Sequence, residues 1–270
     1  MLLGAVAQAW TYPVKSFAGV RSDALVLDAE GPVGDRAWGV YDLEADVVLS
    51  AKRTGALLGA TVRGDVVTLP DGTSGALGDN ALDVALSAWL GRPVQMVRVD
   101  DQPTLRIEMH QDNEDERSPL VRWRSPRGRY VDLFALHLLS TGSLRRCEAA
   151  HPELDWDVRR FRPNLLVDTD VPEAEWMGGV LRAGAVEVTV PDQLTERCVM
   201  ITRAQAELRE QRSSLRALAR SVSGFEGRIT AGSAKALLGC YGEVRIAGTI
   251  RVGDPVELIS SARSSDTHPA

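Results

Sequence analysis

Residues 185–200 read AVEVTVPDQLTERCVM, and both the fold and the chemistry of the chain can be argued outward from them. Residues 185–190 alternate apolar and polar side chains, which predicts a β-strand with one buried face. Pro191 lacks a backbone donor and ends the hydrogen-bonding ladder of that strand. Cys198 therefore follows a strand end, directly after Arg197.

The thiol of Cys198 has two possible roles. An ordinary thiol has a pKa of about 8.5, so about 3% of it is thiolate at pH 7, and a neighbouring cation such as Arg197 or a bound metal would increase that fraction. Most free cysteines, however, are small buried hydrophobes. The local sequence leaves a functional and a structural cysteine both open.

Short strand patterns surround this stretch on both sides and favour an antiparallel sheet or barrel over a parallel sheet with crossover helices. We therefore expect a mainly β fold with a few helices, of the α+β class. The predicted strands cover residues 4–12, 24–28, 37–41, 60–63, 66–69, 165–168 and, as two strands, 241–258, and residues 133–139 are an apolar run.

Three segments predict helices. Residues 80–90 have helical spacing, with Asp79 or Asn80 able to cap the start and Gly91 the end. Residues 203–220 are charged and helical in pattern. A third helix is expected after Ser140 and Thr141, which either cap it or, because a helix N-terminus binds anions, hold a phosphate. The expected core face of the first helix consists of Ala81, Val84, Ala85, Ala88 and Trp89.

Bulk composition excludes several classes of function. The formal charge of −6 argues against general nucleic-acid binding. No apolar run approaches the roughly 20 residues that span a bilayer, and the N-terminus lacks a signal peptide's basic region, so we expect no membrane association and a cytoplasmic location. Three cysteines without CxxC spacing and four scattered histidines argue against a zinc site or a disulfide framework.

Composition also suggests the domain boundaries. An acidic run at 111–116 is followed by an arginine-rich run at 117–129, so residues 100–130 are expected to form a linker or mobile loop. A nucleic-acid patch is the less favoured reading of the same arginines. Residues 1–99 and 131–259 would form two domains, and residues 260–270 a disordered tail.

Basic residues recur at predicted turns and strand ends. Lys15 and Ser16 follow Pro13, Arg36 enters a strand, and three arginines at 159–162 precede Asn164. Arginines at a strand entrance either decorate the surface or point at an anion, and both readings stay open from the residues alone.

Five of these segments, taken in order, resemble the MOSC family, the molybdenum-cofactor sulfurase C-terminal domain family with its N-terminal β-barrel partner. The resemblance runs from about residue 4 to 259 and is nearest to stand-alone proteins related to the mitochondrial amidoxime-reducing component. It rests on YPVKS at 12–16, GDRAW at 34–38, RFRPN at 160–164, Arg197-Cys198 and GTIRVGD at 248–254.

The resemblance implies an N-terminal antiparallel β-barrel-like subdomain packed closely on a C-terminal MOSC β-barrel. It further implies a molybdopterin-type cofactor, with Cys198 as catalytic residue and metal ligand, and reduction of a small-molecule, N-oxygenated substrate. Electrons would come from a separate flavin or iron–sulfur reductase. The residues implied around the cofactor are Lys15, Ser16, Arg36, Ser140, Thr141, Arg162, Asn164 and Arg197.

The chain departs from the family pattern at Thr195, where many members have a cysteine, and over residues 201–205 after the ligand position. The resemblance therefore implies the cofactor but not the substrate wall, and Glu196 is a candidate for that wall. A sulfur carrier using a Cys198 persulfide and a non-catalytic cofactor carrier are the alternative functions.

Overall fold

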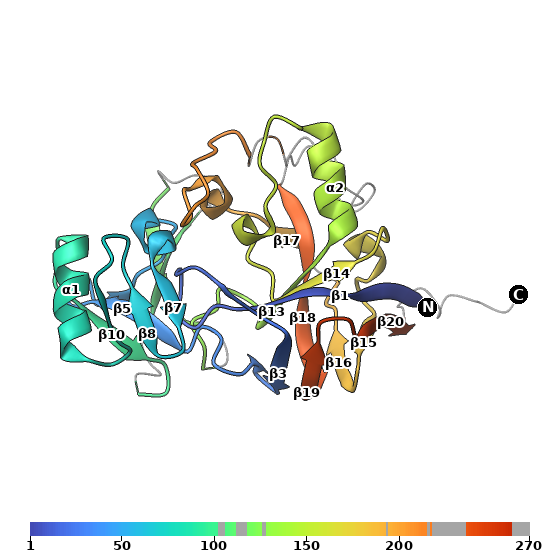
Figure 1. Ribbon diagram of the computed structural model, residues 1–270, viewed down its shortest axis with the longest axis horizontal. Coiled ribbons are helices and arrows are strands. Elements are labelled where there is room, and N and C mark those ends of the chain that lie inside the picture. Colours follow the sequence, from blue (N-terminus) through green and yellow to red (C-terminus); the bar gives the residue numbers. More distant parts are fainter. Residues whose placement is uncertain are drawn as a thin grey trace, which may run out of the picture.

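The computed structural model describes residues 1–101, 106–111, 118–125, 128–192, 194–214, 217 and 236–260. The predicted tail falls almost wholly on residues 261–270, which lie outside the described residues. The Gly- and Ser-rich segment 221–233, for which the sequence favours a loop, also lies outside them. Two halves of the molecule lie side by side, with helix α1 at one end and the N-terminus and strand β20 at the other (Figure 1).

A closed barrel of seven strands forms the half that contains the N-terminus. Its order is β13-β14-β1-β20-β15-β16-β18, and β18 closes the ring by pairing with β13. All of these pairings are antiparallel except the parallel pair β13–β14. The strands are β1 (Leu2–Thr11), β13 (Leu136–Ser140), β14 (Leu165–Asp168), β15 (Val180–Ala183), β16 (Val186–Thr189), β18 (Leu237–Ile246) and β20 (Pro255–Ser260).

Apolar side chains from all around the ring fill the barrel. All five residues of strand β13 are buried, because other parts of the structure cover both faces of the strand. Trp176, which is fully buried, packs in the same cluster as Leu136, Val167 and Val186. β2 (Val20–Ser22) pairs with β1, and β17 (Leu194–Glu196) pairs with β18. The mainly β fold expected from the sequence is confirmed.

The other half holds two small sheets around a second core. A five-stranded sheet has the order β10-β5-β6-β11-β12, and a three-stranded sheet has the order β7-β8-β9. This second core includes Leu49, Leu57 and Val67, together with Leu86 of α1. The elements are β5 (Trp38–Asp42), β6 (Val47–Val48), η1 (Gly55–Gly59), β7 (Thr61–Arg63), β8 (Val66–Thr68), β9 (Ser74–Ala76), α1 (Asn80–Leu90), β10 (Val94–Arg98), β11 (Ile107–His110) and β12 (Leu120–Trp123).

Helix α1 has the predicted bounds and caps but a different buried face. The Asp79 carboxylate accepts a hydrogen bond from the Ala81 amide, and Gly91 ends the helix with a φ of 66°, which favours glycine. The buried residues are Leu82 and Leu86, whereas Val84 is 71% exposed. The expected face was right for Ala85 and Trp89, which pack against the core, and wrong for Val84, because it was centred about one position away from the two leucines that reach the core.

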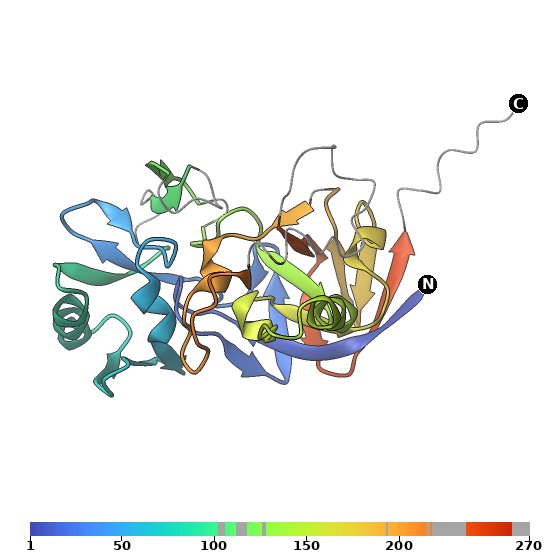
Figure 2. The same cartoon turned by 90° about the horizontal axis from the view of Figure 1, so that it is seen from above.

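Two segments link the halves. β3 (Ala24–Asp28) pairs with both β4 (Gly31–Pro32) and β19 (Gly248–Arg251). Along the chain, β19 lies between the barrel strands β18 and β20. Strand β1 belongs to the barrel by pairing, although it precedes residue 99. The segment 100–130 is more than a linker, because β11 and β12 within it extend the five-stranded sheet (Figure 2).

Short helices complete the barrel half. α2 (Thr141–Ala150) packs beside β14, and η2 (Val158–Arg160), η3 (Glu173–Glu175) and η4 (Val199–Thr202) form single turns. The helix expected over 203–220 was wrong for residues 203–211, which form turns with a β-bridge between Gln205 and Leu208. A side chain from another element holds the backbone of this segment: the Arg160 guanidinium donates to the carbonyl of Arg209 at 2.9 Å.

Candidate functional site

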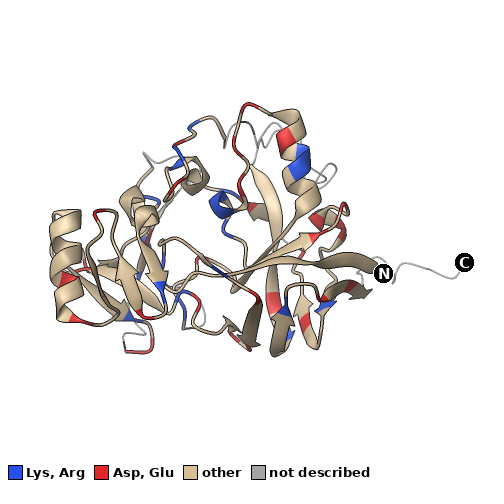
Figure 3. Ribbon diagram, viewed as in Figure 1, with Lys and Arg blue, Asp and Glu red and all other residues tan. Residues whose placement is uncertain are grey.

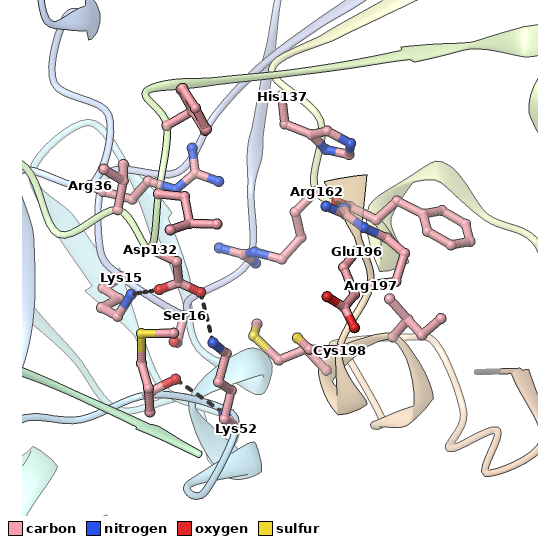
Figure 4. Close-up of a pocket in the computed structure, with 18 of the residues that line it drawn as sticks. Lys15, Ser16, Arg36, Lys52, Asp132, His137, Arg162, Glu196, Arg197 and Cys198 are labelled. Carbon is pink, nitrogen blue, oxygen red and sulfur yellow. Dashed lines mark hydrogen bonds and ion pairs between the residues drawn. The ribbon is translucent and has the colours of Figure 1, made fainter. Parts of the chain in front are cut away.

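A cavity of about 200 Å³ lies where the two halves meet, and residues from both halves point into it (Figure 4). The N-terminal half contributes turn residues near Lys15 and Lys52, and the barrel half contributes the strand ends that carry Arg162 and Cys198. Seven of the nine residues predicted for the site line it: Lys15, Ser16, Arg36, Arg162, Asn164, Arg197 and Cys198.

Two lysines share one carboxylate at the side of the cavity formed by the N-terminal half. The Nζ atoms of Lys15 and Lys52 lie 2.8 and 3.0 Å from the two oxygens of Asp132. Both lysine side chains are almost fully buried, whereas that of Asp132 is 35% exposed. The trio therefore carries one excess positive charge.

The ionisation of this trio follows from burial and mutual attraction. Burial tends to raise the pKa of Asp132, but Lys15 and Lys52 outweigh it and hold that pKa far below its usual range. Burial lowers the pKa of Lys15 despite Asp132. For Lys52, burial is outweighed by Asp132 and then by Cys198, so its pKa is raised. Lys52 is thus the lysine whose charge Cys198 stabilises.

A network of polar groups holds the side chain of Arg36 in place. Its guanidinium pairs with the buried Asp35 and lies 4.6 Å from the Tyr12 ring centroid. The Asn164 Oδ1 accepts from the His137 amide and from Arg36, and its Nδ2 donates to Asp35 and to the Trp10 carbonyl. Because all its polar atoms are engaged by protein groups, Asn164 positions Arg36 rather than offering a free group to a ligand.

Arg162 crosses the interface between the halves. Its Nη1 donates to the Phe17 carbonyl at 2.7 Å, and its guanidinium carbon lies 4.2 Å from the Tyr12 ring centroid. Burial and the nearby charge of Arg36 lower its pKa to about 10, although Tyr12 opposes them. An anion in the cavity would relieve this cost of burying a cation.

Backbone strain is concentrated at the cavity. Five non-glycine residues among those described have positive φ, and three of them line the cavity: Ser16 at 69°, Arg36 at 48° and Arg162 at 56°. Each such residue costs of order 1–3 kcal/mol and persists only where the surroundings impose it. These three side chains are therefore aimed into the cavity at the expense of local backbone energy.

Cys198 lies between β17 and η4 at the barrel side of the cavity. It is partly exposed, whereas Cys147 and Cys240 are buried. The neighbouring Arg197 donates from Nη1 to the Phe161 carbonyl at 3.1 Å, while its Nε is buried without a hydrogen-bond partner among the described residues. Burial and Arg197 hold the pKa of His137 well below its usual range, so the imidazole is neutral.

The charge of the cavity is opposite to that of the chain. Its two acidic residues are Asp132 and Glu196, against six basic ones in a chain of net charge −6. Figure 3 shows basic residues in the region between the halves and acidic residues spread over the outer loops. The basic residues are Lys15, Arg36, Lys52, Arg160, Arg162 and Arg197. Such a cavity suits an anionic ligand.

Ser140 and Thr141 do not line the cavity, so the structure corrects their placement. Ser140 is fully buried, and its Oγ accepts from the Ser143 amide as the N-cap of α2. Thr141 instead donates to the Asp168 carboxylate at 2.8 Å. The start of α2 is also occupied by the buried Glu173, which accepts from the Ser140 amide at 2.6 Å. The cap of α2 therefore uses the Ser140 hydroxyl, which the family resemblance had placed around the cofactor.

Sequence reasoning missed several residues of the cavity. Lys52 and Asp132 lie in loops without a motif of their own, and Asp132 directly follows the segment interpreted as a linker. Phe134, which comes just before β13, and Tyr241, which lies on β18, also line the cavity. The available signal was a single charge between apolar residues, as in Val131-Asp132-Leu133.

Two family models match almost the whole chain. The MOSC N-terminal beta barrel domain matches residues 3–126, and the MOSC domain matches residues 126–257. The chain belongs to the MOSC family. Among curated proteins, no relative matches it. The domain boundaries expected at residues 99 and 131 remain predictions.

Solved structures resemble this MOSC protein at low sequence identity. A crystal structure of a hypothetical protein is 13% identical, with a TM-score of 0.45, over 97% of this chain and 70% of that one. The YuaD protein from Bacillus subtilis is 11% identical, with a TM-score of 0.45, over 94% and 93%. YiiM from Geobacillus stearothermophilus is 16% identical, with a TM-score of 0.36, over 57% and 73%.

The MOSC family is associated with molybdenum-cofactor binding, and the residues of the cavity fit such a group. An anionic pterin phosphate would meet the basic side chains, and the buried Arg197 Nε offers a donor that the described residues leave unused. Cys198 supplies a thiolate, a soft ligand. Among the described residues, no cluster of three or more His, Cys, Asp or Glu could hold a metal without the cofactor. The same residues include no helix long and apolar enough to cross a membrane.

Proposed function

We propose that this MOSC protein is a molybdenum-dependent oxidoreductase that reduces a small N-oxygenated substrate, with electrons supplied by a separate reductase. One observation carries the proposal: the partly exposed thiol of Cys198 opens into the same cavity as the basic cluster. A metal bound by Cys198 and a phosphate bound by the cluster can therefore belong to one ligand.

The two sides of the cavity would hold different parts of the cofactor. Lys15, Lys52, Arg36 and Arg162 would bind the phosphate and the polar edge of the pterin, each charge-assisted hydrogen bond contributing about 1.5–3 kcal/mol. Cys198 would ligate molybdenum. Asp132 and Asn164 would position these cations, because each contacts them through hydrogen bonds already present in the protein.

When bound, the cofactor supplies two-electron oxygen-atom transfer. The N–O bond of the substrate breaks, and with two electrons and two protons its oxygen leaves as water. The electrons come from a flavin or iron–sulfur reductase, since the sequence has no motif for either group. The protein's own residues anchor the cofactor, keep its charge compensated and leave the Cys198 side open to substrate.

The test compares wild type with Cys198→Ser and the matched control Cys147→Ser, which removes a buried thiol in α2 away from the cavity. Protein from a host that makes the cofactor should contain molybdenum and pterin and should reduce an N-oxide with reduced benzyl viologen as electron donor. Cys198→Ser should lose this activity and keep pterin, while Cys147→Ser keeps both. Wild type without molybdenum or pterin would refute the proposal.

A sulfur carrier is the second candidate, because Cys198 is the one partly exposed cysteine in the described part of the chain and lies in a basic cavity. Cationic side chains favour the thiolate that would attack a persulfide donor. Mass spectrometry of metal-free protein would then show one additional, reducible sulfur atom on Cys198. Molybdenum and pterin bound in wild type without reductase activity would instead indicate a cofactor carrier.

A further inference from the structure

Two aromatic rings form a pair in the wall of the cavity. The centroids of Phe134 and Tyr241 are 4.9 Å apart, with an angle of 25° between the ring planes. Phe134 comes just before β13, and Tyr241 lies on β18 directly opposite His137 of β13. The barrel's closing strand pair therefore fixes the position of both rings.

This pair is not part of a hydrophobic core. Both rings are partly exposed, and neither belongs to any of the four hydrophobic clusters that the described residues form. Both line the cavity together with apolar side chains from other elements, among them Met109, Leu133 and Met200. A stacked pair that fills no core and faces a cavity leaves aromatic surface for a ligand.

The pair lies beside the groups assigned to the reaction. Burial raises the pKa of the Tyr241 phenol, and Arg197, Asp132, Cys198 and Lys52 all influence it electrostatically. Phe134, Tyr241 and Cys198, whose thiol would ligate the metal, all line the same cavity. The lining of the cavity thus combines cationic side chains with apolar and aromatic ones.

We propose that Phe134 and Tyr241 form a stacking surface that binds the planar aromatic ring of the substrate next to Cys198. This inference rests on the proposed function and names its substrate class: small heteroaromatic N-oxides are favoured over aliphatic ones. The ring stacks on the pair while the oxidised nitrogen points to the Cys198 side. Reduction consumes two electrons from the separate reductase and two protons from solvent, and it yields the free heteroaromatic base and water.

The test compares quinoline N-oxide with trimethylamine N-oxide, which has no ring, using reduced benzyl viologen as electron donor. The variant Phe134→Leu keeps an apolar side chain but removes the stack. We expect it to reduce kcat/KM for quinoline N-oxide about 2- to 12-fold and to leave trimethylamine N-oxide unaffected, since aromatic pairs contribute about 0.5–1.5 kcal/mol beyond burial. Trp123→Leu, which removes a 43% exposed ring outside the cavity, should change neither value.

A binding measurement separates this inference from the proposed function. Calorimetric titration with quinoline, the reduced product, needs no electron donor, and Phe134→Leu should weaken its binding by the same 2- to 12-fold. If wild type lacks reductase activity but binds quinoline in this way, the proposed function fails and the stacking surface stands. Equal losses for both N-oxides, no quinoline binding, or a fall in pterin content in Phe134→Leu would each overturn the inference.

Discussion

At the scale of single residues, the cavity depends on charges that are buried before any ligand binds. Lys15 and Lys52 are compensated by one partly exposed carboxylate, and Arg162 by carbonyl and ring contacts. Burying these cations is costly for the fold, and an anion in the cavity would reduce that cost.

Asp132→Asn should destabilise the protein in a pH-dependent way. The variant leaves two buried lysines without their anion, and because Asp132 is 35% exposed we expect a loss of about 1–3 kcal/mol at pH 7 rather than the 3–5 of a fully buried pair. The folded pKa of Asp132 is depressed, so its stabilisation is complete above the unfolded pKa of about 3.9 and is lost as pH falls through the lower folded value. Urea unfolding should therefore show the difference from wild type shrinking below about pH 4, and a constant difference would contradict this.

Arg162→Met should weaken cofactor retention without unfolding the chain. The loss of one charge-assisted contact of about 1.5–3 kcal/mol corresponds to about 10- to 150-fold in affinity. Pterin fluorescence after dialysis measures what remains bound. Arg182→Met, which removes a 46% exposed arginine on β15, is the matched control and should retain the cofactor like wild type. Equal retention in both variants would remove Arg162 from the cofactor site.

At the scale of elements, Leu86 and Val84 of α1 distinguish the observed buried face from the predicted one. Leu86→Ala should cost about 2–5 kcal/mol, because Leu86 is fully buried in the second core. Val84→Ala should change the free energy of unfolding by less than about 0.5 kcal/mol, since that side chain is 71% exposed. Chemical denaturation of the two variants gives both values, and a larger loss for Val84→Ala would support the predicted face instead.

Local pattern predicted the elements better than it predicted their partners. The strand at 24–28 and the helix at 80–90 follow from alternation, helical spacing and caps, which are local properties. Capping by Ser140 was one of the two readings that the local sequence left open, and Glu173, 33 residues away, provides the contact that the local pattern did not contain. Lys52 and Asp132 could not be placed together either, because only tertiary contacts bring distant loops to one cavity.

At the scale of the whole molecule, the N-terminal part of the chain supplies β1 to the barrel, so the two halves should unfold together. β1 lies between β14 and β20 in the barrel, and Arg203 from the barrel half donates to the Lys52 carbonyl at 2.6 Å. Scanning calorimetry should therefore give one cooperative transition for the full chain. Residues 131–260 alone lack β1 and should show no dispersed amide resonances, whereas a folded fragment or two separate transitions would contradict this account.

The placement of the cavity explains why the molecule needs both halves. The lysines come from the N-terminal half, and Arg162, Arg197 and Cys198 come from the barrel half, so neither half alone contains the candidate site. Backbone strain at Ser16, Arg36 and Arg162 falls on both sides of this interface. The stability of the packed halves offsets that strain and keeps the cations aimed at one point.

The central claim is that Cys198 binds molybdenum inside the basic cavity, and X-ray absorption at the molybdenum edge tests it most directly. Wild type should hold molybdenum and pterin in equal amounts, with sulfur from the pterin and from the protein around the metal. In Cys198→Ser the account predicts one sulfur neighbour fewer. An unchanged number of sulfur neighbours, or wild-type protein without molybdenum, would contradict it.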